Sequence, residues 1–262
     1  MRFRLRAALL AVLVAAAAAG CNAGNGVLGP RYEYEEDLTL SLDGSATLVV
    51  NASIPALVAL RGFALDTNPR ARADLLTAKV RELYQSQYAD VVRVMQWSRS
   101  NRRFVGVRLH IPNIRELPKA PPFSWSIYEL QQQDHQTTFR HTLGAPVRGS
   151  TATDPEWSGD EVVAFRLHLP SRIQYQNSRT LDTNQPRSAA RGNILTWEQR
   201  LADRLAGKPI AWEQGVPGVM AVRMDSQSIL YRTLYLFGIA FLAAVAVLGL
   251  LIWLTMRKGR ET

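Results

Sequence analysis

The side chains best suited to acid–base or metal chemistry are spread thinly along this chain of 262 residues. Metal sites need ligands clustered at turn or helical spacing, and the four histidines stand far apart. The sequence also has no G-x-S-x-G elbow, no glycine-rich phosphate loop and no dinucleotide fingerprint. We therefore predict no catalytic residue, no metal site and no cofactor. The histidines are His110, His135, His141 and His168.

Arginine and aromatic residues gather in one stretch of the chain. A guanidinium group binds phosphate in a forked geometry, and aromatic rings settle at membrane interfaces. We therefore predict that Trp97, Arg99, Arg102, Arg103 and Phe104 contact anionic headgroups, with the three arginines exposed in a loop between strands. The alternative is an ordinary solvated hairpin loop. The whole stretch contains Arg93, Trp97, Arg99, Arg102, Arg103, Phe104 and Arg108.

An acidic run near the N-terminus is the other charged cluster. It holds Glu33, Glu35, Glu36 and Asp37 at the start of an expected strand. A pair of carboxylates can act as acid and base, but a solvated strand end explains this run better.

The first 21 residues have the pattern of a secretory signal. Three arginines precede an apolar run that is too short to span a bilayer. Small residues stand directly before Cys21, the only cysteine, as a lipoprotein signal peptidase requires. We predict a signal peptide at residues 1–20, followed by lipid attachment at Cys21 and a tether to residue 30. An ordinary signal peptide with a chance cysteine is the alternative.

The C-terminal end contains a second apolar stretch. Residues 233–256 carry no charge, and at about 1.5 Å rise per residue they span a hydrocarbon core of about 30 Å. Basic residues follow at once, so the positive-inside rule places the C-terminus in the cytoplasm. We predict a transmembrane helix at residues 227–256 and a cytoplasmic tail at 257–262. The protein would be a single-pass cell-membrane protein with an extracytoplasmic ectodomain.

The predicted ectodomain, residues 31–226, begins with a run of hairpins. Asp43-Gly44 stands between two alternating apolar runs, which is a strong hairpin signal. Pro55 is expected to end the second strand. The strands of three hairpins are predicted at residues 38–42 and 46–54, 91–97 and 104–111, and 125–132 and 137–143.

Helices and further strands complete the expected fold. Asn68 is the expected N-cap of a helix that runs to Tyr88. The turn-rich residues 144–160 form a possible internal boundary. These elements predict an α+β fold, mainly an antiparallel sheet with one long and one or two short helices, plus the C-terminal transmembrane helix. The remaining elements are strands at 162–169, 194–198, 210–213 and 219–224 and a short helix at 200–206.

The order of these parts resembles the LppM-type bacterial lipoprotein family. The resemblance lies in the signal ending at Cys21, Asp43-Gly44-Ser45 after a strand, the proline-terminated strand, the helix, residues 192–197 and the C-terminal span. It covers most of the chain and is architectural. It implies an exposed α+β domain that binds envelope glycolipids, with no established enzyme activity. It assigns no binding residue.

Three functions follow from these observations. The first is a non-enzymatic, membrane-anchored envelope lipoprotein whose domain binds lipid or glycolipid. The second is an adaptor that docks another envelope protein, and the third is an unrecognised hydrolase with dispersed catalytic residues. The formal net charge is +9, but much of it belongs to the two ends, so the domain is only mildly basic. We therefore expect no nucleic-acid partner.

Overall fold

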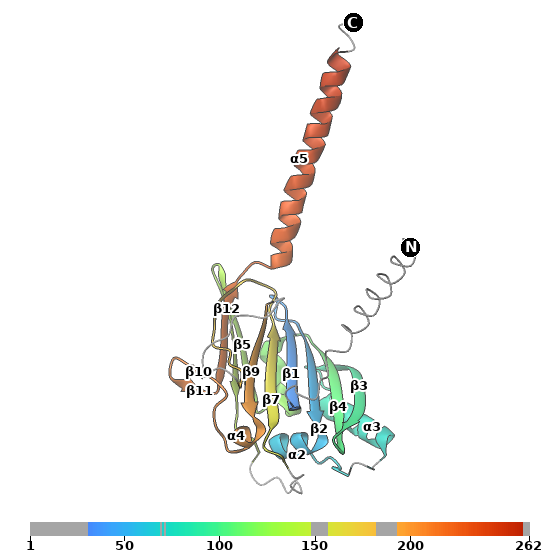
Figure 1. The fold of residues 1–262 in the computed structure, drawn as a ribbon, viewed down its shortest axis with the longest axis vertical. Helices are drawn as coiled ribbons and strands as arrows, with labels where there is room; N and C mark the ends of the chain where they lie inside the picture. Colours follow the sequence, from blue (N-terminus) through green and yellow to red (C-terminus); the bar gives the residue numbers. More distant parts are fainter. Residues whose placement is uncertain (1–30, 69, 71, 148–156, 182–192, 259–262) are drawn as a thin grey trace, which may run out of the picture. The chain divides into compact units, whose positions relative to one another are not determined.

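A computed structural model describes residues 31–68, 70, 72–147, 157–181 and 193–258 (Figure 1). The predicted signal peptide, the lipid attachment at Cys21, the tether and the last part of the cytoplasmic tail lie outside the described residues.

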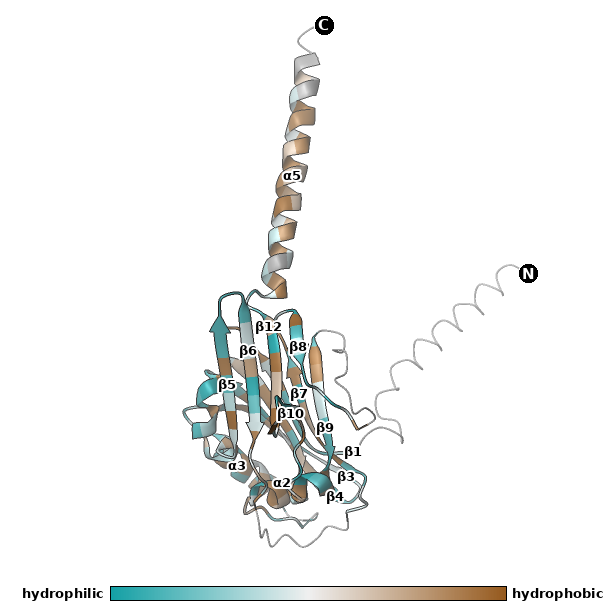
Figure 2. Cartoon of the chain, turned by 90° about the vertical axis from the view of Figure 1, so that its left-hand side faces the viewer, coloured by the Kyte–Doolittle hydropathy of each residue, from teal (hydrophilic) through white to brown (hydrophobic). Residues whose placement is uncertain are grey.

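Two antiparallel sheets make up most of the domain. The larger has six strands in the order β3-β4-β2-β1-β7-β9, and the smaller has four in the order β5-β6-β12-β8 (Figures 1 and 2). A short β10–β11 hairpin stands beside them. The strands are β1 (Arg31–Leu40), β2 (Ala46–Ser53), β3 (Asp90–Arg99), β4 (Arg102–Ile111), β5 (Ser126–Gln133), β6 (Gln136–Leu143), β7 (Glu161–His168), β8 (Ile173–Gln176), β9 (Ile194–Arg200), β10 (Trp212–Glu213), β11 (Val216–Pro217) and β12 (Val219–Asp225).

The helices of the domain are short. They are α2 (Ile54–Arg61), α3 (Ala73–Tyr84), α4 (Leu201–Leu205) and the 3₁₀ turns η1 (Ile114–Lys119) and η2 (Pro121–Phe123). In α3, Leu76, Val80 and Tyr84 recur every fourth residue and are buried, so one face of the helix packs on the sheet. This helix begins at Ala73 and ends at Tyr84, inside the predicted bounds.

Pro55 starts a helix where the sequence predicted only the end of a strand. Ser53 caps α2 by accepting a hydrogen bond on its Oγ from the Ala56 N–H at 3.2 Å. Proline suits the first helical turn because its missing N–H needs no partner there. Gly62 ends the helix with φ 67°, the left-handed conformation that glycine tolerates best. The helix packs its buried side against β2 and β4.

One hydrophobic cluster fills the space between the two sheets. It joins Tyr34, Leu48 and Val107 of the large sheet to Phe139 and Val222 of the small one. Residues before and after the turn-rich stretch at 144–160 belong to it, such as Leu143 and Val163. The α+β class with mainly antiparallel sheets is confirmed.

The C-terminal helix α5 (Ile229–Lys258) is apolar along most of its length (Figure 2). Its stretch Ile229–Trp253, 25 residues, is long and apolar enough to cross a membrane. No residue in the most apolar part of this stretch is buried, so α5 is not a core helix of the domain. The predicted C-terminal helix is confirmed as a candidate membrane span.

Candidate functional site

The turn of the β3–β4 hairpin is tighter than the sequence suggested. Ser100 and Asn101 both have positive φ, 49° and 57°, and together they make a two-residue turn. This conformation matches the right-handed twist of the strands. Consequently Arg99 and Arg102 are paired strand residues, and the predicted six-residue loop does not exist.

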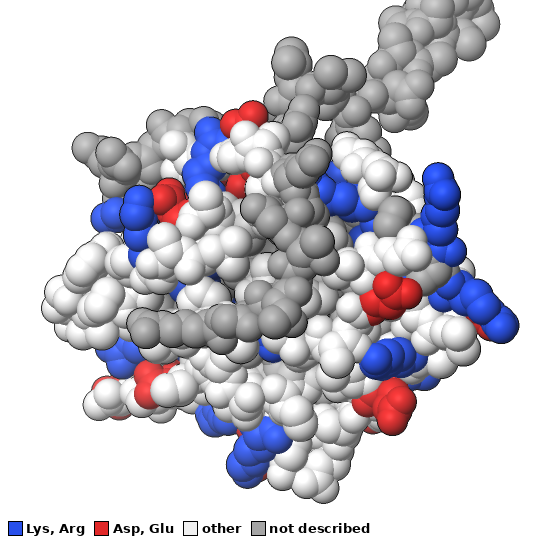
Figure 3. Space-filling model, turned by 90° about the horizontal axis from the view of Figure 1, so that it is seen from below, with Lys and Arg blue, Asp and Glu red and all other residues white. Residues whose placement is uncertain are grey.

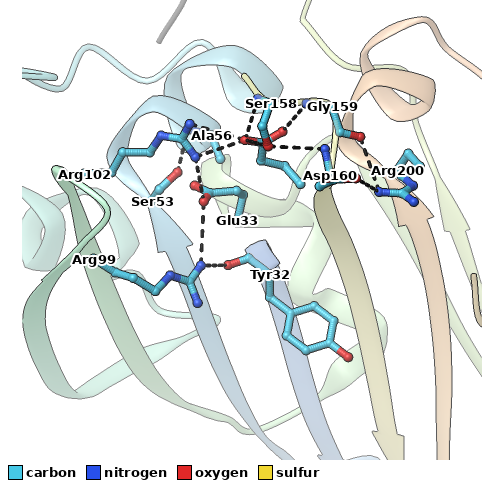
Figure 4. Close-up of polar contacts among 11 residues, drawn as sticks. Tyr32, Glu33, Ser53, Ala56, Arg99, Arg102, Ser158, Gly159, Asp160 and Arg200 are labelled. Atoms are coloured by element: carbon cyan, nitrogen blue, oxygen red, sulfur yellow. Dashed lines mark hydrogen bonds and ion pairs between the residues drawn. The ribbon is translucent and has the colours of Figure 1, made fainter. Parts of the chain in front are cut away.

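Arg102 is held in an ion-pair network (Figure 4). Its Nη1 lies 2.9 Å from Glu33 Oε1 and 3.2 Å from Glu161 Oε1, and both carboxylates are almost fully buried. Arg99 donates to the backbone oxygen of Tyr32 at 2.5 Å and lies 3.6 Å from Glu33. These arginines neutralise acidic groups of the same domain.

Two further predictions about this hairpin are wrong. Arg103 is only 6% exposed and donates to the Asp66 backbone oxygen at 3.2 Å, so it is not a loop cation. Phe104 is buried beneath Trp97, with ring centroids 5.5 Å apart in a stacked arrangement. Glu33, at 2% exposure, is no solvated strand end. The error arose because the turn needs only two residues, so the neighbouring side chains belong to the sheet.

A bulge in β3 changes which side chains point outward. Val91 pairs with Leu109 and Arg93 pairs with Arg108, which leaves Val92 as an extra residue. Side chains two residues apart normally share a face, but the inserted residue reverses this relation. Val91 therefore faces the core while Arg93 is exposed.

Arg93 and Arg108 are consequently direct neighbours on the outer face of the sheet. Opposite residues in an antiparallel pair have Cβ atoms about 5 Å apart, and like charges there are destabilising. Within the described part of the chain, neither side chain has a hydrogen bond or ion pair. The closest carboxylate in the same row of the sheet is that of Asp37, two strands away, and it lies 3.0 Å from His168 Nε2.

Apolar surface continues directly from the two arginines. Met95 and Trp97, 41% and 39% exposed, follow Arg93 on the same face of β3. Gly106 lies opposite Met95, and a Cβ there would come within 3.2 Å of the indole ring and 2.9 Å of Asn51 Oδ1. Glycine therefore lets the Trp97 ring lie over the sheet. Arg93, Met95, Trp97, Gly106 and Arg108 are called the outer patch below.

Elsewhere the charges of the outer face are paired. Glu35 Oε1 lies 2.9 Å from Arg166 Nη1, and Glu35 Oε2 accepts a hydrogen bond from Asn51. Burial acts to lower the pKa of Arg166, but the charge of Glu35 and the contact with Tyr32 outweigh it. The pKa of Arg166 is therefore raised above its ordinary value. On another face, seen in Figure 3, Lys and Arg side chains are scattered among uncharged and acidic ones. The outer patch differs because its two cations adjoin each other and, among the described residues, neither forms an ion pair. The carboxylate of Asp90, in the next row of the same face, accepts a hydrogen bond from Gln85 at 3.1 Å.

The interior contains a small cavity between the two sheets. Its walls are mostly apolar, and Glu36, Tyr128, His141 and Arg166 form the polar part. The cavity has a volume of about 20 Å³, which is room for one water molecule. The apolar walls are Leu38, Phe139, Phe165, Leu167, Trp197 and Met220.

Burial shifts Glu36 and His141 toward their uncharged forms. Glu36 accepts hydrogen bonds from the hydroxyls of Tyr34 and Tyr128, and its burial raises its pKa. The His141 ring stacks on Tyr128 with centroids 4.0 Å apart, and burial lowers the pKa of His141 to about 3. Three ligand-type side chains do not converge on one point anywhere in the described ranges.

Sequence reasoning found the hairpin but expected Arg99, Arg102 and Arg103 to be exposed in a longer loop. It noted Arg93 and Arg108 as part of the basic stretch and then favoured the residues nearest the expected loop. The bulge gives no clear sequence signal, because Asp90 to Trp97 shows no interruption of its strand pattern. The interior arginines Arg61 and Arg204 were missed altogether, since neither belongs to a basic cluster in the sequence.

Comparison with known proteins gives a weak structural likeness. No family model matches the chain, and no curated protein matches it. Among solved structures, the folded domain of the Mycobacterium tuberculosis LppM protein is similar at 12% identity and a TM-score of 0.38. The match covers 77% of this chain and 95% of that one. The resemblance seen in the sequence therefore has only weak structural support, and no residue is given a role from it.

Proposed function

We propose that the protein is a membrane-anchored envelope lipoprotein whose extracytoplasmic domain binds anionic lipid or glycolipid headgroups through the outer patch. It would bind without catalysing a reaction. The helix α5 would hold the domain at the membrane, with the basic C-terminal tail in the cytoplasm. Lipid attached at Cys21 would be a second anchor.

The pairing of Arg93 with Arg108 is the observation that carries this proposal. Two adjacent guanidinium groups repel each other, and an anionic phosphate between them would remove that repulsion. Met95 and Trp97 lie next to them and would enter the interfacial region of the bilayer. A lipid surface is favoured over an acidic protein because the same chain carries a candidate membrane span.

The inner cavity supports recognition of the headgroup and not of a whole acyl chain. A pocket for a drug-sized ligand measures at least about 300 Å³. The inter-sheet cavity, at about 20 Å³, holds a single water molecule. The inter-sheet cavity therefore has no room for an acyl chain.

The test is co-sedimentation of residues 32–226 with vesicles. This segment contains every residue of the hydrophobic cluster. We expect binding to phosphatidylglycerol-containing vesicles and to vesicles with anionic glycolipid, and little binding to phosphatidylcholine. Each interfacial cation contributes about 1 kcal/mol, so Arg93→Gln with Arg108→Gln should lower the affinity about 30-fold.

A matched control removes two positive charges elsewhere. Lys79 and Arg172 are also exposed, and Lys79→Gln with Arg172→Gln changes the net charge by the same amount. This control should retain most of the affinity. Equal loss in both double variants would reduce the effect to overall charge, and absence of vesicle binding by the wild type would favour an acidic protein partner.

A further inference from the structure

Two arginine side chains lie inside the domain against one tryptophan ring. Arg61 comes from the last turn of α2 and Arg204 from α4. The Cζ atom of Arg61 is 3.1 Å from the centroid of the Trp125 ring, and that of Arg204 is 6.0 Å from it. Arg61 is 8% exposed and Arg204 is 3% exposed. Both charges are therefore almost fully removed from water.

Most of the donors on these two groups have no protein acceptor. A guanidinium group offers five N–H donors. Arg61 donates to the Leu60 backbone oxygen at 3.3 Å, and Arg204 donates to the Gly144 backbone oxygen. The Nε atoms of both are buried without a hydrogen-bond partner. Unsatisfied buried donors are costly, so this arrangement needs an explanation.

No described side chain pairs directly with these two charges, although Glu36 interacts electrostatically with both. Among the described residues, no carboxylate forms an ion pair with Arg61 or Arg204. The nearest acidic group in this region, Glu36, takes its hydrogen bonds from two tyrosines. Burial, followed by the charge of Arg61, lowers the pKa of Arg204 to about 10. At neutral pH the interior thus keeps two positive charges side by side.

A third polar group near the same ring lacks a partner. His141 Nε2 is buried without a hydrogen bond, and the imidazole centroid is 6.3 Å from that of Trp125. His141 also lines the inter-sheet cavity. The Nε atoms of Arg61 and Arg204, and His141 Nε2 when it carries the imidazole proton, are therefore unpartnered donors near Trp125. An anion with several acceptor oxygens is the chemical group that would satisfy them.

We propose that Arg61 and Arg204 bind an oxyanion, the carboxylate or phosphate group of a small ligand, beside Trp125. Arg61, the more exposed of the two, is on the side from which the ligand enters. This site is separate from the outer patch, because Tyr34 beside Arg61 faces the core while Arg93 and Arg108 face away from it. The inference does not depend on the proposed lipid binding.

The experiment is thermal unfolding of the full chain in a non-ionic detergent. Sodium phosphate, sodium acetate and sodium chloride are titrated at constant pH and ionic strength. A ligand that binds only the folded state raises Tm by mass action. We expect a saturable rise in Tm with phosphate or with acetate and none with chloride; the anion that acts at lower concentration identifies the preferred source.

Variants then locate the site. Arg61→Gln and Arg204→Gln should each weaken the anion at least tenfold, whereas the exposed control Lys79→Gln should bind normally. Arg204→Lys keeps the charge but loses the fork, so it should bind more weakly than the wild type. Arg204→Lys also provides the binding test if the glutamine variants do not fold. No saturable rise in the wild type, or an equal rise in all variants, would overturn the proposal.

Discussion

Arg102 and Arg93 belong to the same hairpin, yet their side chains have opposite roles. Arg102 neutralises Glu33 and Glu161, which are 2% exposed. Arg102→Gln would leave two buried carboxylates with less compensation, which destabilises by about 3 kcal/mol. We expect a clear fall in the midpoint of chemical denaturation for this variant.

The control for this prediction is Arg93→Gln. Exposed substitutions usually change stability by less than about 0.5 kcal/mol. Loss of the repulsion with Arg108 would shift the result slightly toward greater stability. If both variants unfold at the same midpoint, the distinction between structural and free arginines in this hairpin is wrong.

Glu36 gives a pH dependence of known sign. Burial raises its pKa above the ordinary 4.5, against the opposing charge of Arg61, so the folded state holds the proton more tightly than the unfolded chain. Its stabilising contribution is full below the unfolded pKa and is lost as pH rises through the folded pKa. Glu36→Gln should therefore gain stability over the wild type as pH rises from the unfolded pKa of Glu36 through its higher folded pKa.

Chemical denaturation at several pH values measures this difference. Glu82→Gln, on the exposed side of α3, is the control and should run parallel to the wild type. A difference between Glu36→Gln and wild type that stays constant with pH would show that Glu36 titrates alike in the folded and unfolded states.

At the scale of the elements, one buried asparagine joins three strands. The Asn177 amide donates to the backbone oxygens of Trp212 and Val219, both at 2.9 Å. Its Oδ1 accepts from the Trp197 indole at 3.1 Å and from the Ala221 N–H at 2.9 Å. It thus fixes β9, which contains Trp197, and β10 against β12.

Replacing this residue should be among the more damaging single changes in the domain. Asn177→Leu keeps a similar volume but leaves several buried polar groups unsatisfied, each at about 1–3 kcal/mol. We expect a loss of at least about 3 kcal/mol in the free energy of unfolding. Gln131→Leu replaces an exposed amide on β5 and should change stability little. Similar stability of the two variants would contradict the role of Asn177.

The elements were predictable where a local residue determines the backbone. Asp43-Gly44 predicted the first hairpin correctly, and Gly44 indeed has φ 95°. The second turn was predicted to be longer than it is, because Ser100 and Asn101 adopt positive φ without a glycine to signal it. The helix α2 was missed although Ser53 and Pro55 together form a helix-start signal.

Features that depend on distant contacts were not predictable. The bulge at Val92 becomes visible only when β3 is aligned with β4. The strand predicted at residues 219–224 exists, but its partners β6 and β8 lie far from it in the sequence. Likewise, Arg61 and Arg204 meet at Trp125 because two sheets and two helices bring together residues far apart in the chain.

For the whole molecule, the proposed function predicts two membrane anchors, one at each end of the chain. The apolar stretch Ile229–Trp253 is exposed in the isolated chain, a costly arrangement in water for so many large apolar side chains. A bilayer would bury them and satisfy the backbone within the helix. We therefore expect α5 to anchor the chain independently of lipid at Cys21.

Cell fractionation with alkaline carbonate washing separates the two anchors. Cys21→Ala should remain in the membrane pellet, because a spanning helix resists extraction far better than one acyl anchor. The same variant truncated after Ser228 loses both anchors and should move to the soluble fraction. The core should survive the truncation, since the hydrophobic cluster ends at Met224.

Truncation alone, with Cys21 intact, shows whether lipid is attached. Retention in the membrane pellet requires a second anchor, and release would leave α5 as the sole anchor. Extraction of full-length Cys21→Ala by carbonate would show that α5 does not span.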